Sequence, residues 1–489
     1  MSDKEVLREQ IVMRMQTDNP WWTTGRIPGD IDKMHRRAYI DMLYEQVSSN
    51  AIHRAIVLMG PRRVGKTILI YHTIARLIAN GVSPQRIVYL SVDTPIYNGF
   101  SLERLLLMAN AALMSEANDL RGFYVFYDEV QYLKDWELHL KSLVDTYRQT
   151  RFVVSGSATA ALHMKSRESG AGRFHDFILP PLTFNEFLHL QDMGHLMVRR
   201  DLQWNGKPIR GYDTINITEL NKQFLRYINY GGYPEVVFSP EIQQDPSRYM
   251  QHDIVDKVML KDLPNLYGIS DTQELYRLFI HIAYRSGEEF TVEDLSQTSG
   301  IRKDVIRRYL TYLESAFLIK VIHRVDVNAR KMQRITRFKI YLTNPSLRCA
   351  LFTPLSNADP AVGSMVETAI FAQRIQRDDE ELYYANWKMG RKDGEVDMVA
   401  LDRLRQKPSW AVEIKWSDRY FEHPGELKSL LSFIEENDCQ NEAIVTSMTR
   451  FGTQVLQRVN LLFIPAAVYA YQLGKNTLES RKSSLRMSN

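Results

Sequence analysis

Short apolar runs alternate with amphipathic helical stretches through roughly the first 250 residues of the chain. The run from Ala55 to Met59 is continuously apolar, as expected for a strand that is buried on both faces of a parallel sheet. A helical stretch from Thr67 to Ala79 follows it and ends at Asn80 and Gly81. The further predicted strands cover residues 86–92, 124–127, 151–154 and 177–179. Strands separated by helices are typical of βαβ units, so the pattern predicts the α/β class with a doubly wound sheet.

The periodicity becomes purely helical between Ser270 and Ile322. A short helix is expected to begin at Thr291 and to end at Gly300, and a second one follows. This second helix, from Lys303 to Ala316, has an apolar face made of Val305, Ile306, Tyr309, Leu310 and Leu313. Two short helices around a glycine turn, followed by a strand-like segment over residues 338–342, predict a winged helix.

Basic residues gather on and after this second helix. They are Arg302, Lys303, Arg307, Arg308, Arg324, Arg330, Lys331, Arg334, Arg337 and Lys339. Such a face is where a recognition helix and its wing would meet DNA. The alternative is a solvated charge run on a winged helix that serves as a lid or docking surface.

A second alternation of helices and strands begins at Val362. Helices are predicted from Val362 to Arg377, which includes Glu367, and from Glu426 to Glu436. The predicted strands cover residues 382–385, 395–400, 410–415, 443–446 and 461–464. The C-terminal part is therefore predicted to form another α/β domain.

Length, charge and cysteine content limit the possible classes of protein. A chain of 489 residues is too long for one ordinary core. Its net charge of +4 is mild, so DNA binding would have to rest on a local patch. Cys349 and Cys439 have no partners at metal-ligand spacing, which suits a reducing compartment. We find no apolar stretch of about 18 residues and no apolar signal core, and therefore expect a cytoplasmic protein without membrane contact.

A glycine-rich segment joins the first predicted strand to its helix. Its residues are Gly60, Pro61, Arg62, Arg63, Val64, Gly65, Lys66 and Thr67. This spacing, between a strand and a helix, matches the phosphate-binding loop, in which backbone N–H groups surround the phosphates at the positive end of the helix. The whole segment is thus predicted to bind ATP, with Lys66 at the terminal phosphates and the Thr67 hydroxyl on Mg²⁺.

Two adjacent carboxylates, Asp128 and Glu129, end the predicted strand 124–127. Carboxylates rarely follow a buried apolar run unless something ionic compensates for the lost water. We expect Asp128 to hold Mg²⁺ and Glu129 to polarise the water that attacks ATP. The next strand ends at Ser155 and Ser157, either of which could contact the γ-phosphate or be an ordinary turn residue.

Asp397, Glu413 and Lys415 lie on two predicted strands of the C-terminal part, and Glu367 lies on the helix before them. Element order and motif resemble the restriction-endonuclease core and the PD-(D/E)xK nucleases, although Val396 stands where that motif often has proline. Asp397 and Glu413 could share one Mg²⁺, with Glu367 as a further ligand. Glu413 and Lys415 point to the same face of a strand, so Lys415 could hold or deprotonate the attacking water. The alternatives are ordinary surface charges or a nuclease fold that only binds.

Several segments together resemble one family, the archaeal and bacterial AAA-type ATPases whose C-terminal half is a nuclease-like domain of unknown function. They are residues 19–22, 60–67, 128–131, 170–173, 179–182 and 231–235. The resemblance spans roughly residues 19 to 450 and implies an arginine that acts on the γ-phosphate of its own or a neighbouring subunit. Arg173 holds the matching place, with Arg167 as a substitute, and a solvated arginine is the alternative. Such sites often lie between subunits, so we expect a homo-oligomer.

These predictions divide the chain into five parts. They are an N-terminal extension (1–35), an AAA+ P-loop ATPase domain (36–250), a winged-helix domain (251–345), a PD-(D/E)xK nuclease-like domain (346–475) and a tail (476–489). Three functions remain possible. They are an ATP-regulated, Mg²⁺-dependent DNA nuclease, an ATP-driven DNA-binding switch with an inactive nuclease-like domain, and an ATPase that remodels a protein partner without nucleic acid.

Overall fold

The computed structural model describes two compact units. It covers residues 3–49, 53–113, 120–156, 172–204, 207–326, 337–375, 381–389, 392–402, 407–437, 439 and 442–488. The first unit contains residues 1–180 and 482–489, and the second contains residues 181–481. Residues 181–250, which we expected to belong to an ATPase domain, thus cluster with the C-terminal part. No helix in the described ranges is both long and apolar enough to cross a membrane.

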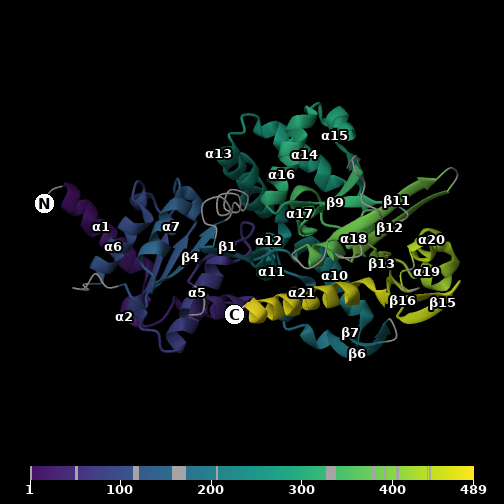
Figure 1. The fold of residues 1–489 in the computed structure, drawn as a ribbon, viewed down its shortest axis with the longest axis horizontal. Helices are drawn as coiled ribbons and strands as arrows, with labels where there is room; N and C mark the ends of the chain where they lie inside the picture. The colour runs from purple at the N-terminus through teal and green to yellow at the C-terminus, as the bar shows by residue number, and fades with distance from the viewer. Residues whose placement is uncertain are drawn as a thin grey trace. The chain divides into compact units, whose positions relative to one another are not determined.

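In the described part of the first unit, all five strands of the sheet are parallel, in the order β2-β3-β4-β1-β5 (Figure 1). The strands are β1 (Ala55–Met59), β2 (Ile87–Ser91), β3 (Tyr124–Asp128), β4 (Arg151–Gly156) and β5 (Phe174–Ile178). The helices are α1 (Asp3–Asp18), α2 (Trp21–Thr24), α3 (Gly29–Asp32), α4 (Ile40–Ser48), α5 (Lys66–Ala79), α6 (Leu102–Ala112) and α7 (Trp136–Thr146). The predicted α/β class and parallel sheet are confirmed, because the apolar runs form central strands that are buried on both faces.

The segment Asn19 to Trp22 covers the open edge of this sheet at β2. The Asn19 side chain accepts a hydrogen bond from Tyr89 N (2.6 Å) and donates one to Tyr89 O (2.9 Å), as a neighbouring strand would. The indole N–H groups of Trp21 and Trp22 both donate to Ile87 O, at 3.0 and 2.7 Å. Unpaired edge groups are thereby satisfied, so part of the predicted N-terminal extension completes the ATPase sheet.

The described part of the second unit is built on a mixed nine-stranded sheet in the order β15-β16-β14-β13-β12-β11-β9-β10-β8. Its strands are β8 (Glu289–Thr291), β9 (Ile319–Val325), β10 (Arg337–Leu342), β11 (Leu382–Met389), β12 (Lys392–Leu401), β13 (Pro408–Glu413), β14 (Glu442–Ser447), β15 (Gly452–Leu456) and β16 (Val459–Pro465). Strands β8 to β10, which we predicted to belong to a winged helix, share one sheet with the C-terminal strands, because β9 pairs in parallel with β11 (His323 with Tyr383). We expected two separate domains here, and hydrophobic periodicity does not report pairing between strands so far apart in sequence.

The two short helices predicted around Gly300 are present. Helix α15 (Val292–Ser299) begins at Thr291, whose hydroxyl accepts a hydrogen bond from Asp294 N (2.9 Å) while Thr291 N donates to the Asp294 carboxylate (3.2 Å). This reciprocal capping fixes the start of the helix. Gly300, with a φ of 75°, ends it, and α16 (Lys303–Ser315) follows.

Further helices of the second unit cover the mixed sheet or precede it (Figure 1). They are α9 (Phe184–Leu190), α10 (Ile217–Tyr230), α11 (Pro234–Phe238), α12 (Pro240–Gln244), α13 (Leu263–Tyr267), α14 (Thr272–Tyr284), α17 (Ser346–Leu351), α18 (Val362–Arg374), α19 (Arg419–Glu422), α20 (Lys428–Asn437) and α21 (Ala466–Ser488), of which the residues from Lys482 onward cluster with the first unit. Residues Ser247–Asp256 and Val258–Asp262 are π-helical, and β6 (Met197–Trp204) pairs with β7 (Lys207–Thr214) in a separate hairpin. Neither the hairpin nor the length of α21 was predicted.

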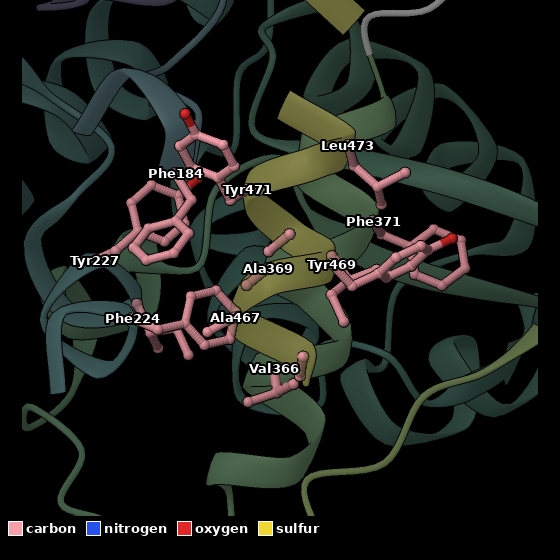
Figure 2. Close-up of a cluster of buried hydrophobic side chains, with 14 of the residues drawn as sticks. Phe184, Phe224, Tyr227, Val366, Ala369, Phe371, Ala467, Tyr469, Tyr471 and Leu473 are labelled. Carbon is pink, nitrogen blue, oxygen red and sulfur yellow. The ribbon is translucent and has the colours of Figure 1, made fainter. Parts of the chain in front are cut away.

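Helix α21 lies in the middle of the main core of the second unit. Figure 2 shows Tyr471 on the side of Phe184 and Tyr227, whereas Tyr469 projects toward Phe371 of α18. The rings of Phe184 and Tyr227 are 5.4 Å apart, and both side chains are buried. This packing ties α9 and α10 to α18 and α21, and it explains why the compact units divide just before α9.

Candidate functional site

The loop between β1 and α5 has the conformation that its glycines allow. Gly60 has a φ of 156°, and a Cβ atom there would lie 2.2 Å from Leu179 O. Gly65, at a φ of 92°, caps the N-terminus of α5. Any larger residue at position 60 would collide with backbone, so glycine is required for the loop to pass this close to the strand end.

Asp128, at the end of β3, is the centre of a hydrogen-bond network. Its carboxylate accepts bonds from the hydroxyls of Thr67 (2.7 Å), Tyr89 (2.9 Å) and Ser155, and the Asp128 side chain is buried. The network joins the start of α5 to β2 and β4 beside the loop. The predicted pairing of Thr67 with Asp128, where both would face Mg²⁺, is thus geometrically available.

Lys66 and Glu129 flank this network. The Lys66 ammonium donates to the backbone oxygens of Gly60 (3.0 Å) and Pro61 (2.8 Å), so it lies folded over its own loop. Glu129 adopts the left-handed conformation (φ of 56°) and accepts a hydrogen bond from Gln131. Burial raises the pKa of the Glu129 carboxyl; Lys66 opposes this shift and Asp128 adds to it. A left-handed non-glycine residue is strained, which indicates that surrounding contacts hold the carboxylate in a defined direction.

Tyr89 and Arg37 belong to the site but were not predicted. The buried Arg37 donates to Val64 O in the loop (2.6 Å) and to Pro180 O (3.0 Å), and it thereby fixes the loop against the end of β5. Neither residue is part of a motif, and an arginine or tyrosine at a distant position carries no sequence signal for such a contact. Ser157 and Arg167 lie outside the described residues.

Arg173 lies at the amino ends of the strands of the ATPase sheet, whereas the phosphate-binding loop lies at their carboxyl ends. It precedes β5, and its carbonyl accepts a hydrogen bond from Ala55 N at the start of β1 (2.9 Å), whereas the loop follows the end of β1. A strand of five residues spans roughly 16 Å. The Arg173 guanidinium forms an exposed ion pair with Asp145 (2.7 Å). It therefore cannot reach a phosphate bound at its own loop.

A second polar centre lies in the mixed sheet around Asp397, Glu413 and Lys415. The Lys415 ammonium lies 2.7 Å from Glu413 and 3.4 Å from Asp397, and Ile414 N donates to Asp397 (2.7 Å). In the pairing of β11 with β12, Tyr383 pairs with Val399 and Ala385 with Val396. Tyr384 therefore lies opposite two residues, Asp397 and Met398. This β-bulge lies at Asp397, and bulges can redirect a side chain. The three predicted residues converge, although Lys415 lies beyond the end of β13.

Lys339 of β10 also enters this centre, which was not predicted. We expected it on the exposed basic face, but it is buried and its ammonium lies 2.7 Å from Glu395, 3.0 Å from Glu367 and 3.9 Å from Asp397. Burial alone would lower the pKa of Lys339, but the surrounding acidic groups raise it well above its ordinary value. We call Glu367, Glu395, Asp397, Glu413, Lys339 and Lys415 the acidic centre.

Asp397 and Glu413 are the residues of the acidic centre that could hold a divalent cation. Oε2 of Glu413 is buried and has no hydrogen-bond partner among the described residues. Burial and the neighbouring Asp397 raise the pKa of Glu413 to about 8, although Lys415 opposes the shift. When all four carboxylates are ionised, they exceed the two ammonium groups by two negative charges, which one Mg²⁺ would balance. These two carboxylates therefore fit a hard cation that keeps most of its waters.

Glu367, predicted as a further metal ligand, is engaged elsewhere. Its Oε1 accepts hydrogen bonds from Lys339 (3.0 Å) and the Tyr341 hydroxyl (2.6 Å). Within the described ranges, no group of three or more His, Cys, Asp or Glu side chains is arranged to hold a metal ion. A metal at this centre would thus rest on two carboxylates and water.

The exposed face of α16 carries part of the predicted basic surface. Arg307 and Arg308 are exposed on it, whereas Arg302 pairs with Asp304 (3.4 Å) and Lys303 pairs with Glu293. Arg337 pairs with Glu289 (2.7 Å). Arg330, Lys331 and Arg334 lie outside the described residues. Local acidic partners therefore reduce the net charge of this surface.

The fold and the loop define a P-loop ATPase domain, and comparison with known families agrees. Residues 52–188 match the model of an AAA domain, and residues 221–359 match a domain of unknown function (DUF8612). The chain thus contains an AAA-type ATPase domain followed by a domain whose role the match does not supply.

Related proteins are uncharacterised. A Haemophilus influenzae protein is 23% identical over 318 residues, which cover 64% of this chain and 72% of that protein. A Methanocaldococcus jannaschii protein is 25% identical over 325 residues, covering 62% of this chain and 65% of that one. Among solved structures, the Aeropyrum pernix ORC1 protein in complex with DNA matches with a TM-score of 0.33 and 12% identity, covering 68% of this chain and 95% of that chain. Nothing about the function of this chain follows from a match at that level.

Replacement of Lys66 tests the loop as a nucleotide site. Lys66→Ala is expected to weaken ATP binding by roughly 10- to 100-fold, because the terminal phosphates lose their charged partner. Titration calorimetry with a non-hydrolysable ATP analogue measures this. Lys141→Ala, at a lysine of α7 away from the loop, is the matched control. Unchanged affinity in Lys66→Ala would show that ATP binds elsewhere.

Replacement of Glu129 separates binding from hydrolysis. Glu129→Gln keeps the shape of the side chain but not its charge, so ATP binding should persist while turnover falls roughly 10²- to 10⁴-fold. Phosphate release and nucleotide titration measure the two effects, with the exposed Glu45→Gln as control. Normal turnover would mean that another group activates the water.

Proposed function

We propose that this chain is an ATP-hydrolysing AAA-type ATPase coupled to a Mg²⁺-dependent DNA nuclease centre in its second unit. The observation that carries the nuclease part is the convergence of Asp397, Glu413 and Lys415, with one buried Glu413 oxygen that lacks a partner among the described residues. Burying these charged groups costs free energy, which ordinary surface charges would avoid by remaining in water.

In the ATPase part, each group next to the loop has one task. The backbone of residues 60–67 cradles the phosphates of ATP, and Lys66 exchanges its loop carbonyls for phosphate oxygens. Thr67 and Asp128, which already share a hydrogen bond, hold Mg²⁺. Glu129 orients the attacking water, and contacts such as the hydrogen bond from Gln131 hold its carboxylate in place.

Arg173 acts on the ATP of a neighbouring subunit in this proposal. It lines a pocket of about 540 Å³ together with His53, Val144, Asp145, Arg148 and Gly172. This surface lies at the amino ends of the strands, opposite the phosphate-binding loop. An assembly that places this surface against the loop of the next subunit would therefore complete that subunit's ATP site. The homo-oligomer expected from the sequence would supply such an assembly.

In the nuclease part, Asp397 and Glu413 would hold Mg²⁺, which supplies charge stabilisation at the scissile phosphate. Lys415 donates to both carboxylates and can hold the attacking water beside them. Ile414 N fixes one oxygen of Asp397, so its other oxygen remains for the cation. The exposed Arg307 and Arg308 of α16 favour a nucleic acid as the substrate over a protein partner.

The role of Arg173 can be tested in mixed assemblies. Arg173→Ala is expected to lower ATP turnover roughly 10³-fold while binding persists, and Arg148→Ala in the same pocket should retain turnover. Lys66→Ala subunits keep Arg173 but are expected to stay largely empty at an ATP concentration that fills the Arg173→Ala subunits. Mixing them with Arg173→Ala subunits should therefore restore activity. A mixture no more active than its separate components would return Arg173 to an ordinary surface role.

The nuclease centre is tested by plasmid cleavage with Mg²⁺ or Mn²⁺, with and without ATP. Wild type is expected to cleave, and Asp397→Ala should lose at least about 10²-fold in rate because the metal loses a ligand, while its ATP hydrolysis persists. Asp393→Ala, at an exposed position of the same strand, should cleave normally. Absence of cleavage by wild type, with ATP hydrolysis intact, would favour the DNA-binding switch.

A further inference from the structure

The winged-helix part supplies a cation to the acidic centre. Lys339 lies on β10, which pairs with β8 and β9 of the winged helix, yet its side chain reaches carboxylates of α18 and β12. Its side chain is 4% exposed, so its charge is balanced locally rather than by water.

Two carboxylates are committed to this lysine. Glu367 accepts from Lys339 and from Tyr341, and Glu395 accepts from Lys339 and from Asn386 (3.0 Å). Asp397 lies 3.9 Å from the same ammonium, at the oxygen that Ile414 N leaves open. Lys339 is therefore directed at the side of Asp397 where a metal would bind.

We propose that Lys339 is a resident cation of the acidic centre, which competes with a divalent metal and holds Glu367 out of the metal's coordination. The inference rests on the proposed nuclease function, because it assumes that Asp397 and Glu413 take up a metal. Lys339 is thus a positioning residue that lowers metal affinity. The acidic centre then contains residues from both β10 and the C-terminal strands.

The test is Mn²⁺ binding to the full-length protein without nucleotide, measured by electron paramagnetic resonance. Binding that Asp397→Ala removes is assigned to the acidic centre. Lys339→Met is expected to bind Mn²⁺ at least about tenfold more tightly at this centre, because one positive charge is lost and Glu367 is released. Lys320→Met, at a half-exposed lysine of β9, should bind as wild type does. Equal or weaker binding in Lys339→Met would overturn the proposal.

The double variant Lys339→Met/Glu367→Gln covers the case in which the single variant does not fold. It removes both partners of an ion pair and leaves the net charge unchanged, so Mn²⁺ affinity should stay within about threefold of wild type. A loss of about tenfold would show that Glu367 is itself a metal ligand and would overturn the proposal. If wild type and Asp397→Ala bind Mn²⁺ equally, the metal centre of the proposed function fails, whatever Lys339 does.

Discussion

A buried carboxylate must find a cation or strong hydrogen-bond donors, and both polar centres of this protein are organised by that constraint. Asp128 meets it with three hydroxyl donors from three elements, which position the loop, β2 and β4 around one point. In the acidic centre, Lys339 and Lys415 supply cations to the buried carboxylates. In the proposed function, a metal offsets the negative charge that the two lysines leave there when all four carboxylates are ionised.

The continuity of the mixed sheet decides how the second unit can work. Because β9 pairs with β11, the strand that carries Lys339 lies within reach of the strands that carry the carboxylates. A winged helix joined by a flexible linker would not hold a buried ion pair with its neighbour. Any ligand that shifts β10 would therefore change the electrostatics of the acidic centre directly.

The two ends of the strands in the ATPase sheet carry different groups of the proposed ATP site. Lys66, Asp128 and Glu129 lie at the carboxyl ends of the strands, and Arg173 lies at the amino end. A parallel sheet gives its ends different surroundings, because the loops after the strands lead into helix N-termini that favour phosphate. A complete site thus needs two copies of the domain in the proposed mechanism.

The sequence by itself determined the parallel sheet, the nucleotide loop, the capped helix-turn-helix and the main C-terminal strands. These features depend on local periodicity and on residues that are adjacent in the chain, such as Gly65 with Lys66 or Thr291 with Asp294. Only the tertiary structure decided that the two predicted C-terminal domains share a sheet, that Arg37 and Tyr89 reach the nucleotide site, and that Lys339 is buried. Strand pairing between distant segments and the direction of a long side chain have no local signature, because they depend on which surfaces meet after the elements have formed.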